Sequence, residues 1–227
     1  MRVAALYDVH GNLPALEAVL ADVAREQPDL IVFGGDVVAG PWPRETLARV
    51  RAVPNARFVV GNADRPADGH PDAAWLWDVL TDEERRFMAT FKEKVSVEGV
   101  LYRHGSPRSV DEIVTHLTPE PLLREMLERV DQRTVVLGHT HVQFDRRVGD
   151  CRIVNAGSVG MPYQGERGAF WAMIAGDVEL RHTDYDVEAA VEALPLDYPG
   201  AADLRGWLLE PLDPQEVAEY FEQQAGR

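Results

Sequence analysis

The chain repeats one local pattern, in which a short apolar run suited to a β-strand ends directly in a polar turn. Val3–Tyr7 is followed by Asp8-Val9-His10, and later runs end in Gly35-Asp36, Gly61-Asn62, His104-Gly105 and Gly138-His139-Thr140-His141. Open α/β sheets carry their chemistry at the carboxyl ends of strands, where residues two apart point the same way. The pattern therefore predicts that these polar groups meet at one edge of the fold.

Each turn taken singly has an ordinary structural explanation. Gly-Asp and Gly-Asn are common turn dipeptides, Asp8 with His10 can be a surface pair or a cap, and His104 alone can be a satisfied core histidine. His139 and His141 are more specific, because alternate positions at a strand end place both imidazoles on one side. Five such turns in series indicate a metal site.

The order of apolar segments predicts an α/β fold. Runs 3–7, 30–33 and 58–60 alternate with helical patterns that start at Leu13 and Pro43, which favours parallel pairing. The four later runs, 144–148, 152–154, 170–174 and 178–181, are short and separated by turns, so we expect the second half to be antiparallel. We expect a single domain over residues 1–227, with a helical cap insertion over 64–94 and a helical tail over 186–227 whose aromatic residues pack on the body.

Composition excludes several classes of protein. Lys and Arg number 23 against 38 Asp and Glu, a net charge of −15, which argues against a nucleic-acid partner. No apolar run is long enough to span a bilayer and residues 1–10 lack a signal-peptide pattern, so we expect no membrane association and a cytoplasmic location. Cys151 is the only cysteine, which excludes an intramolecular disulfide and predicts a small buried hydrophobe. A homo-oligomer is left open.

The ordered motifs Asp-x-His, Gly-Asp, Gly-Asn, His and Gly-His-x-His resemble those of the calcineurin-like metallophosphoesterases. The resemblance runs from Asp8 to about Ser158, and the segments His104–Arg108 and Asn155–Gly160 look like those of the small bacterial and archaeal phosphodiesterase-like branch. It implies a four-layer αββα sandwich with two mixed sheets and a two-metal centre between them. Asn155–Gly160 is expected to form a tight loop under that centre.

The resemblance also implies seven metal ligands in two groups joined by one carboxylate: Asp8, His10 and His141 on one cation, Asn62, His104 and His139 on the other, and Asp36 between them. Oxygen and nitrogen donors without thiolate suit Mn²⁺, Fe, Ni²⁺ or Zn²⁺, of which we favour Mn²⁺. A hydroxide shared by the two cations would be the nucleophile, with Asp36, Asn62 and His104 as catalytic residues.

The sequence thus predicts a metal-dependent hydrolase of phosphoric esters, with a phosphodiesterase for small or nucleotide-type substrates as the first hypothesis. A phosphomonoesterase, a dinucleoside polyphosphate hydrolase and a protein phosphatase would use the same centre. A non-catalytic binding scaffold, as in the retromer subunit that looks like this family, predicts eroded ligands, whereas all seven are intact here.

One position departs from the family's pattern. Many members continue the Gly-Asn turn with His-Asp, and that histidine is taken as the acid that protonates the leaving oxygen, but here Ala63 follows Asn62. The hypothesis is therefore an enzyme that works best on esters with an acidic leaving group. His70 in the cap is a substitute acid by one interpretation and a surface histidine by another.

Two arginines follow ligand turns and are candidates for substrate binding. Arg65 and Arg108 could each hold a non-reacting phosphate through the planar guanidinium. The alternative is that they pair with Asp64 or Asp111 and have a structural role.

Overall fold

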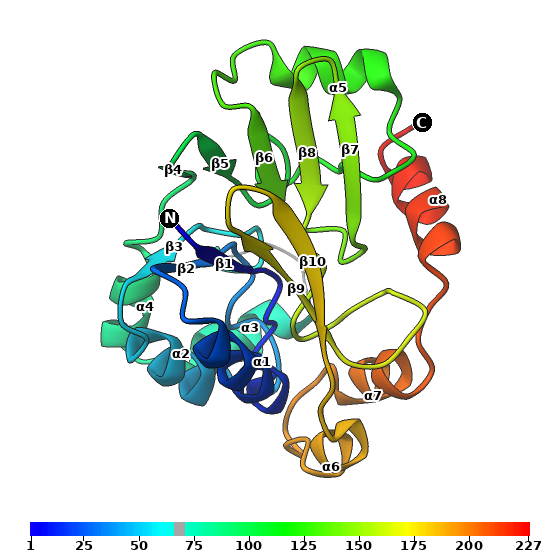
Figure 1. Ribbon diagram of the computed structural model, residues 1–227. Helices are drawn as coiled ribbons and strands as arrows, with labels where there is room; N and C mark the ends of the chain where they lie inside the picture. Colours follow the sequence, from blue (N-terminus) through cyan, green and yellow to red (C-terminus); the bar gives the residue numbers. More distant parts are fainter. Residues whose placement is uncertain (66–70) are drawn as a thin grey trace.

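Two five-stranded β-sheets pack face to face, and helices cover the outer face of each (Figure 1). The computed structural model describes residues 1–65 and 71–227. The first sheet contains, in spatial order, β10 (Val178–Thr183), β9 (Ala169–Ile174), β1 (Val3–Leu6), β2 (Leu30–Phe33) and β3 (Ala56–Phe58). The second contains β4 (Val95–Val97), β5 (Val100–Tyr102), β6 (Thr134–Leu137), β8 (Cys151–Asn155) and β7 (Phe144–Val148). The predicted α/β sandwich with two mixed sheets is confirmed.

Helices bury the outer faces of both sheets. The first sheet shares one core with α1 (Leu13–Glu26), α2 (Pro43–Arg51), α3 (Pro71–Val79) and α4 (Asp82–Met88), and α5 (Glu120–Leu127) packs on the second sheet. Helix α1 begins as its sequence predicts, since the Asn12 side chain accepts the Ala15 N–H at 3.2 Å. Helix α4 begins with a complete capping box between Thr81 and Glu84.

Strand pairing follows burial rather than chain order. In the first half β1, β2 and β3 pair in parallel, as predicted. Of the four later runs, β7 pairs with β8 and β9 pairs with β10 in antiparallel, as predicted. The second half is not antiparallel throughout, because β8 also pairs with β6 in parallel. Strand β8 buries Ile153 and Val154 and takes the inner position, whereas β7, with the charged residues Asp145, Arg146 and Arg147, lies at the edge.

A buried apolar layer joins the two sheets. Val3, Ala5 and Tyr7 of the β1 segment face Tyr102 and Val136 of the second sheet, and the Tyr7 hydroxyl donates to the Val136 carbonyl at 2.9 Å. This contact fixes the sheets relative to each other. As a result, the carboxyl ends of β1, β2, β5 and β6 meet at one edge.

The predicted tail forms helices α6 (Val187–Glu192), α7 (Ala201–Leu209) and α8 (Pro214–Gln224). Trp207 lies 6.0 Å, centroid to centroid, from Tyr163, so it packs on the body as expected. Tyr220 does not, because α8 turns Val217 and Ala218 inward and leaves Tyr220 57% exposed. The single-domain division with a cap over 64–94 stays a prediction.

Two smaller expectations are tested by the described residues. None of their helices combines the length and the apolar character needed to cross a membrane. Cys151 is half-buried at the start of β8, so it is less enclosed than the sequence suggested.

Two glycine substitutions should change stability in opposite directions. A Cβ on Gly34 would lie 2.0 Å from the Tyr7 ring, which the inter-sheet contact holds in place, so Gly34→Ala should lower the free energy of unfolding by about 1–3 kcal/mol. A Cβ on Gly206, within α7, would have no atom within 4 Å, so Gly206→Ala should raise the free energy of unfolding by about 0.5–1 kcal/mol. Urea denaturation measures both, and equal shifts would contradict this packing.

Candidate metal centre

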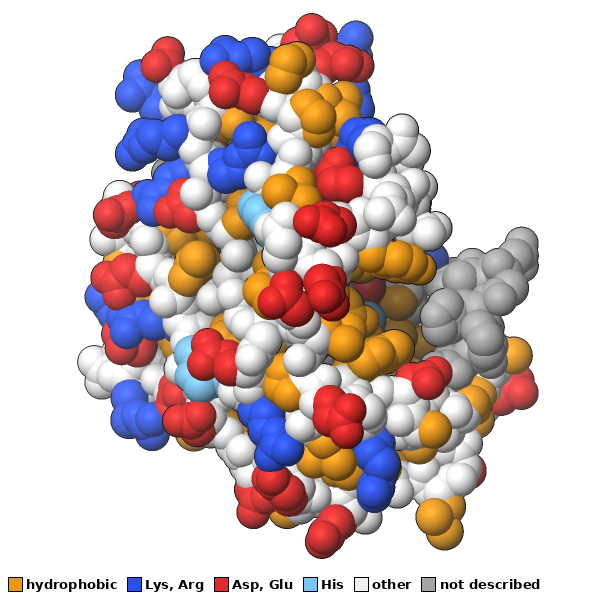
Figure 2. Space-filling view, turned by 90° about the vertical axis from the view of Figure 1, so that its right-hand side faces the viewer, with side chains coloured by type: hydrophobic (Ala, Val, Ile, Leu, Met, Phe, Trp, Pro, Cys, Tyr) orange, Lys and Arg blue, Asp and Glu red, His pale blue; other side chains and the backbone are white. Residues whose placement is uncertain are grey.

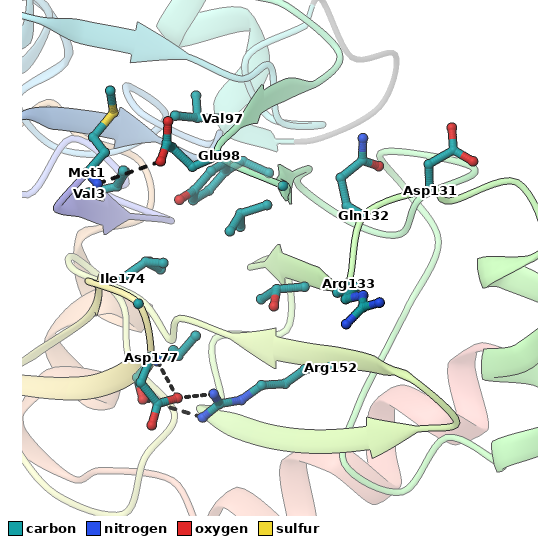
Figure 3. A pocket seen from close by; sticks show the side chains of 16 residues that line it. Met1, Val3, Val97, Glu98, Asp131, Gln132, Arg133, Arg152, Ile174 and Asp177 are labelled. Carbon is teal, nitrogen blue, oxygen red and sulfur yellow. Dashed lines mark hydrogen bonds and ion pairs between the residues drawn. The ribbon is translucent and has the colours of Figure 1, made fainter.

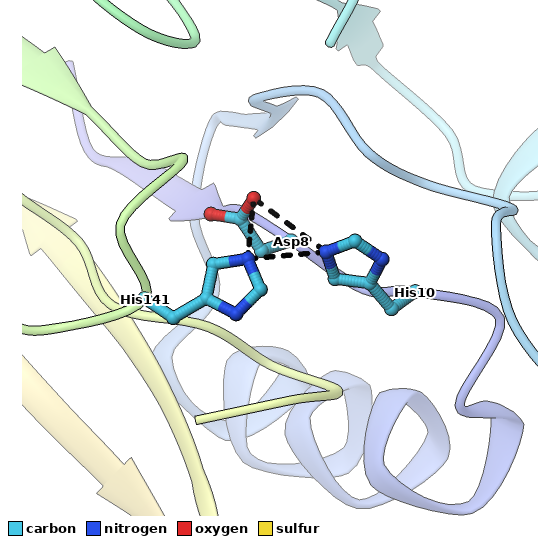
Figure 4. Close-up of side chains that lie close together, drawn as sticks. All are labelled: Asp8, His10 and His141. Atoms are coloured by element: carbon cyan, nitrogen blue, oxygen red, sulfur yellow. Dashed lines mark hydrogen bonds and ion pairs between the residues drawn. The ribbon is translucent and has the colours of Figure 1, made fainter. Parts of the chain in front are cut away.

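The predicted ligands converge at the carboxyl ends of the strands that carry them. Asp8, His10 and His141 form one group, shown in Figure 4, and the second group is made of Asp36, His104 and His139. Within each group the ligand atoms lie within 4.8 Å of one another. The Asn62 Oδ1 atom lies 2.9 Å from His104 Nε2 and so adds an amide oxygen to the second group.

One carboxylate faces both groups. The Oδ2 atom of Asp36 lies 3.4 Å from His104 Nε2 and 3.7 Å from His10 Nε2, and its Oδ1 atom accepts the Ala63 N–H at 2.8 Å. Asp36 is almost completely buried. A carboxylate with this position can serve two cations at once.

The first group fits a cation because its lone pairs point at one another. The Nδ1 atoms of His10 and His141 lie 3.0 and 2.7 Å from the carbonyls of Ala39 and Met161, which can only accept. Both Nε2 atoms therefore carry lone pairs, although they face each other at 3.1 Å. Between two such lone pairs a positive charge is favourable.

An unpartnered oxygen points to the same conclusion. Asp8 is fully buried, and its Oδ1 atom has no hydrogen-bond partner among the described residues, while it lies 3.3 Å from His141 Nε2. Its other oxygen, Oδ2, accepts the His139 N–H at 2.9 Å. A buried carboxylate oxygen without a partner is costly, and a metal ion would satisfy it.

Neighbouring histidines keep the carboxylates of Asp36 and Asp8 ionised, because they lower the pKa of both against the effect of burial. Burial raises the pKa of Asp36, but His104 and His10 outweigh it and hold that pKa well below its usual range. Burial opposes protonation of His104, yet Asp36 and Asp8 prevail and raise its pKa to about 10. Burial and the neighbouring His104 lower the pKa of His139 to about 4. Carboxylates and imidazoles are the donor set of a cation site, and a bound cation would take the place of the proton that Asp36 and Asp8 hold on His104.

The ligand turns are strained. Of the non-glycine described residues, eight have a positive φ, and five of these are predicted ligand positions: Asp8 (51°), His10 (45°), Asp36 (51°), His139 (69°) and His141 (58°). An L-residue in this region costs about 1–2 kcal/mol, and such strain is concentrated at functional sites.

Asp64 was not predicted as a site residue, yet it holds two ligand turns together. Its carboxylate accepts the N–H groups of Asp36 (2.8 Å), Val37 (2.9 Å) and Gly61 (3.0 Å). Burial and the nearby Asp36 raise the pKa of Asp64 to about 6. The sequence signal was its place two residues after Asn62, because Asp in a turn accepts nearby backbone N–H groups.

The loop 155–160 lies under the centre, as expected. The Ser158 hydroxyl and the Gly160 N–H both donate to the Asp8 carbonyl, at 2.7 and 3.0 Å. Gly160 is required by close approach, since a Cβ there would lie 1.8 Å from the Val9 carbonyl oxygen. The loop therefore fixes the backbone of the first ligand turn.

The two predicted substrate-binding arginines are paired with glutamates. Arg108 bonds to Glu112 and, at 2.8 Å, to Glu125, and Arg65 lies 3.6 Å from Glu93. The alternative partners Asp64 and Asp111 are not used: the Asp64 carboxylate accepts backbone N–H groups, and the described partners of both arginines are glutamates. His70, the suggested substitute acid, lies outside the described residues.

Comparison with known proteins agrees with this geometry. Residues 1–178 match the model of the calcineurin-like phosphoesterase superfamily domain. The chain belongs to this superfamily. It is a metal-dependent phosphoesterase, as the motifs predicted.

Relatives of this phosphoesterase include proteins of known and unknown role. Phosphodiesterase YfcE of Escherichia coli is 28% identical over 186 residues, 75% of this chain and 85% of that protein. An uncharacterized protein of Methanocaldococcus jannaschii is 25% identical over 226 residues, 85% of this chain and 91% of its own. The crystal structure of a metallophosphoesterase from Sphaerobacter thermophilus is similar with a TM-score of 0.77 and 26% identity, over 93% of this chain and all of that one.

Asp64→Asn should weaken metal binding about 10- to 100-fold, as loss of a group that orients ligands does. An amide cannot accept all three N–H bonds, because its nitrogen is a donor. Titration of Mn²⁺ by calorimetry measures the affinity. Asp111→Asn, at an exposed aspartate, is the control and should bind like the wild type. Unchanged affinity in Asp64→Asn would refute the role given to this carboxylate.

Proposed function

We propose that the chain is a dinuclear-metal-dependent phosphodiesterase that acts on small or nucleotide-type phosphodiesters. The observation that carries the proposal is Asp36, whose Oδ2 atom lies within 3.7 Å of an imidazole nitrogen from each group. The resemblance to phosphodiesterase YfcE supports the choice of a diester.

The chain's own residues would hold and orient the reacting groups. Two divalent cations, when bound, activate a water molecule and neutralise the charge of the phosphate oxygens. Asp36 would bridge them, with its orientation kept by the Ala63 N–H on Oδ1 and by Asp64 on its backbone. His104 donates Nδ1–H to the Gly34 carbonyl at 3.0 Å, which directs Nε2 toward the centre beside Asn62. We assign Asp36, Asn62 and His104 the catalytic roles.

A small substrate suits the surroundings of the centre. Figure 2 shows a hollow in which histidine atoms are visible at depth beside hydrophobic side chains, on a surface with many acidic groups. With a net charge of −15, this surface disfavours long polyanions, whereas a small phosphodiester needs only the local positive charge of the centre.

Arg65 is the better candidate of the two arginines for the substrate. Its N–H donates to the Asn62 carbonyl at 3.3 Å, so its backbone lies beside a proposed ligand, and its partner Glu93 is exposed and 3.6 Å away. A substrate phosphate could replace that glutamate. Arg108 is bonded to two carboxylates, and a substrate would have to compete with both.

Removal of divalent ions should abolish hydrolysis of bis(p-nitrophenyl) phosphate, and Mn²⁺ should restore it, because the proposed nucleophile depends on the cations. Release of nitrophenolate measures the rate. Asp36→Asn should lose at least about 10²-fold in kcat, while His182→Asn, outside the motifs, should retain full activity. Hydrolysis that persists after chelation would overturn the proposal.

Installing an acid at position 63 should change the leaving-group preference. Ala63→His should raise turnover of alkyl phosphodiesters by about 10²-fold or more, while nitrophenyl esters, whose leaving group needs no proton, change little. The ratio of kcat/KM for methyl and nitrophenyl diesters measures this. Ala63→Asn, similar in size but without an acidic proton, is the control. Equal effects on both esters would refute the missing-acid hypothesis.

A further inference from the structure

Two arginines near proposed metal ligands share one glutamate. The Arg65 Nη2 atom lies 3.6 Å from Glu93 Oε1, and the Arg103 Nη1 atom lies 3.7 Å from Glu93 Oε2. Burial lowers the pKa of Arg103, and the charge of Arg65 acts in the same direction, whereas Glu93 opposes both. Arg65 and Arg103, here called the arginine pair, are thus two like charges that meet at a single carboxylate.

The arginine pair lies beside the second group of proposed ligands. Arg103 directly precedes His104, and the Arg65 N–H donates to the Asn62 carbonyl at 3.3 Å. That bond closes a turn, which keeps the Cα atoms of Asn62 and Arg65 within about 7 Å of each other. The Asn62 Oδ1 atom lies 2.9 Å from His104 Nε2, so the turns that bring these ligands together also bring the arginines together. A molecule held at the centre can therefore extend to the pair.

One guanidinium group of the pair is fixed and the other is accessible. The Arg103 side chain is 7% exposed, and its Nε–H donates to the Ser106 carbonyl at 3.1 Å, which fixes the planar group. The Arg65 side chain is 43% exposed. Glu93 covers Arg103 from the solvent side, because its own side chain is 70% exposed. An anion that arrives from solvent can therefore replace the Glu93 carboxylate against both groups.

Glu93 is a weak partner for the pair. Both of its contacts are longer than a hydrogen bond, whose N···O distance is about 2.7–3.2 Å, and ion pairs of exposed side chains contribute little to stability. Lys92 and Lys94, the two lysines of the chain, are exposed on either side of Glu93 in the sequence and add positive charge. A phosphate group, with about two negative charges and three acceptor oxygens, would match the pair better than one carboxylate does.

Arg152 is held differently. It lies at a cavity of about 550 Å³ near the amino ends of β1 and β6 (Figure 3). Its guanidinium is bonded to Asp145, at 2.6 Å, and to Asp177. Two hydrogen-bonded carboxylates neutralise this arginine, and an anion would have to compete with both. At the arginine pair the balance is reversed, since two cations share one carboxylate among the described residues.

We propose that Arg65 and Arg103 form a subsite for a second phosphate group of the substrate, which Glu93 occupies until the substrate binds. The inference rests on the proposed phosphodiesterase activity and narrows its substrates to phosphodiesters that carry a further terminal phosphate, such as nucleotides phosphorylated at both the 3′ and the 5′ position. The reacting diester lies at the metal ligands, and the second phosphate replaces Glu93 against the pair.

Two thymidine esters that differ by one phosphate test the subsite. Thymidine 5′-(4-nitrophenyl phosphate) and the same ester with a 3′-phosphate release nitrophenolate from the same diester. We expect the 3′-phosphate to raise kcat/KM by about tenfold or more, because hydrogen bonds between charged groups are the strong ones.

Three substitutions should change this preference. Arg65→Gln and Arg103→Gln should each bring the two kcat/KM values within about threefold of each other, since an amide has neither the charge nor the planar fork. Glu93→Gln removes the competing charge and should increase the preference about threefold. Arg57→Gln, at an exposed arginine that donates to the Ala56 carbonyl, is the control and should retain the wild-type ratio.

Calorimetry separates the subsite from the activity. Thymidine 3′,5′-bisphosphate should bind the Mn²⁺-loaded protein about tenfold tighter than thymidine 5′-phosphate, and Arg65→Gln should remove the difference. Circular dichroism checks that the variants are folded. If neither ester is hydrolysed, the proposed function fails, and the binding preference still decides on the subsite. Equal affinities for the two nucleotides, or a preference that persists in folded Arg65→Gln, overturn the inference.

Discussion

Mutual repulsion of buried lone pairs is the interaction on which the rest of this structure depends. The Nε2 atoms of His10 and His141 face each other at 3.1 Å, beside the unpartnered Oδ1 of Asp8. Carbonyl groups fix the far side of both rings, so neither imidazole can turn away. The arrangement is favourable only when a positive charge lies between the two Nε2 atoms and the Asp8 carboxylate. The loop 155–160 holds the backbone of Asp8 in place. Asp64 does the same for the neighbouring turns at Asp36 and Gly61.

The sandwich resists that repulsion through its rigid frame. Tyr7 joins the sheets one residue before Asp8, and Gly34, which packs against the Tyr7 ring, lies two residues before Asp36. The same layer that stabilises the fold thus sets the distance between the two ligand groups.

Local chemistry decided how much could be predicted from the sequence. The convergence of Asp8, Asp36, His104 and His139 could be predicted because each follows an apolar strand, and strand ends converge in any sheet of this kind. The partners of Arg65 and Arg108 could not be found in this way, since Glu93 and Glu125 are brought near by the tertiary fold alone. The parallel pairing of β6 with β8 was missed for the same reason: strand neighbours are chosen by burial across the whole chain.

The left-handed backbone of the ligand residues has an evolutionary consequence. Five proposed ligands hold conformations that an L-residue resists, and two of them bury charge as well. A lineage released from selection for catalysis would therefore gain stability as it exchanged these residues for glycine or for uncharged ones. Because loss of such a centre would increase the stability of the fold, its retention in a chain indicates continued selection for catalysis.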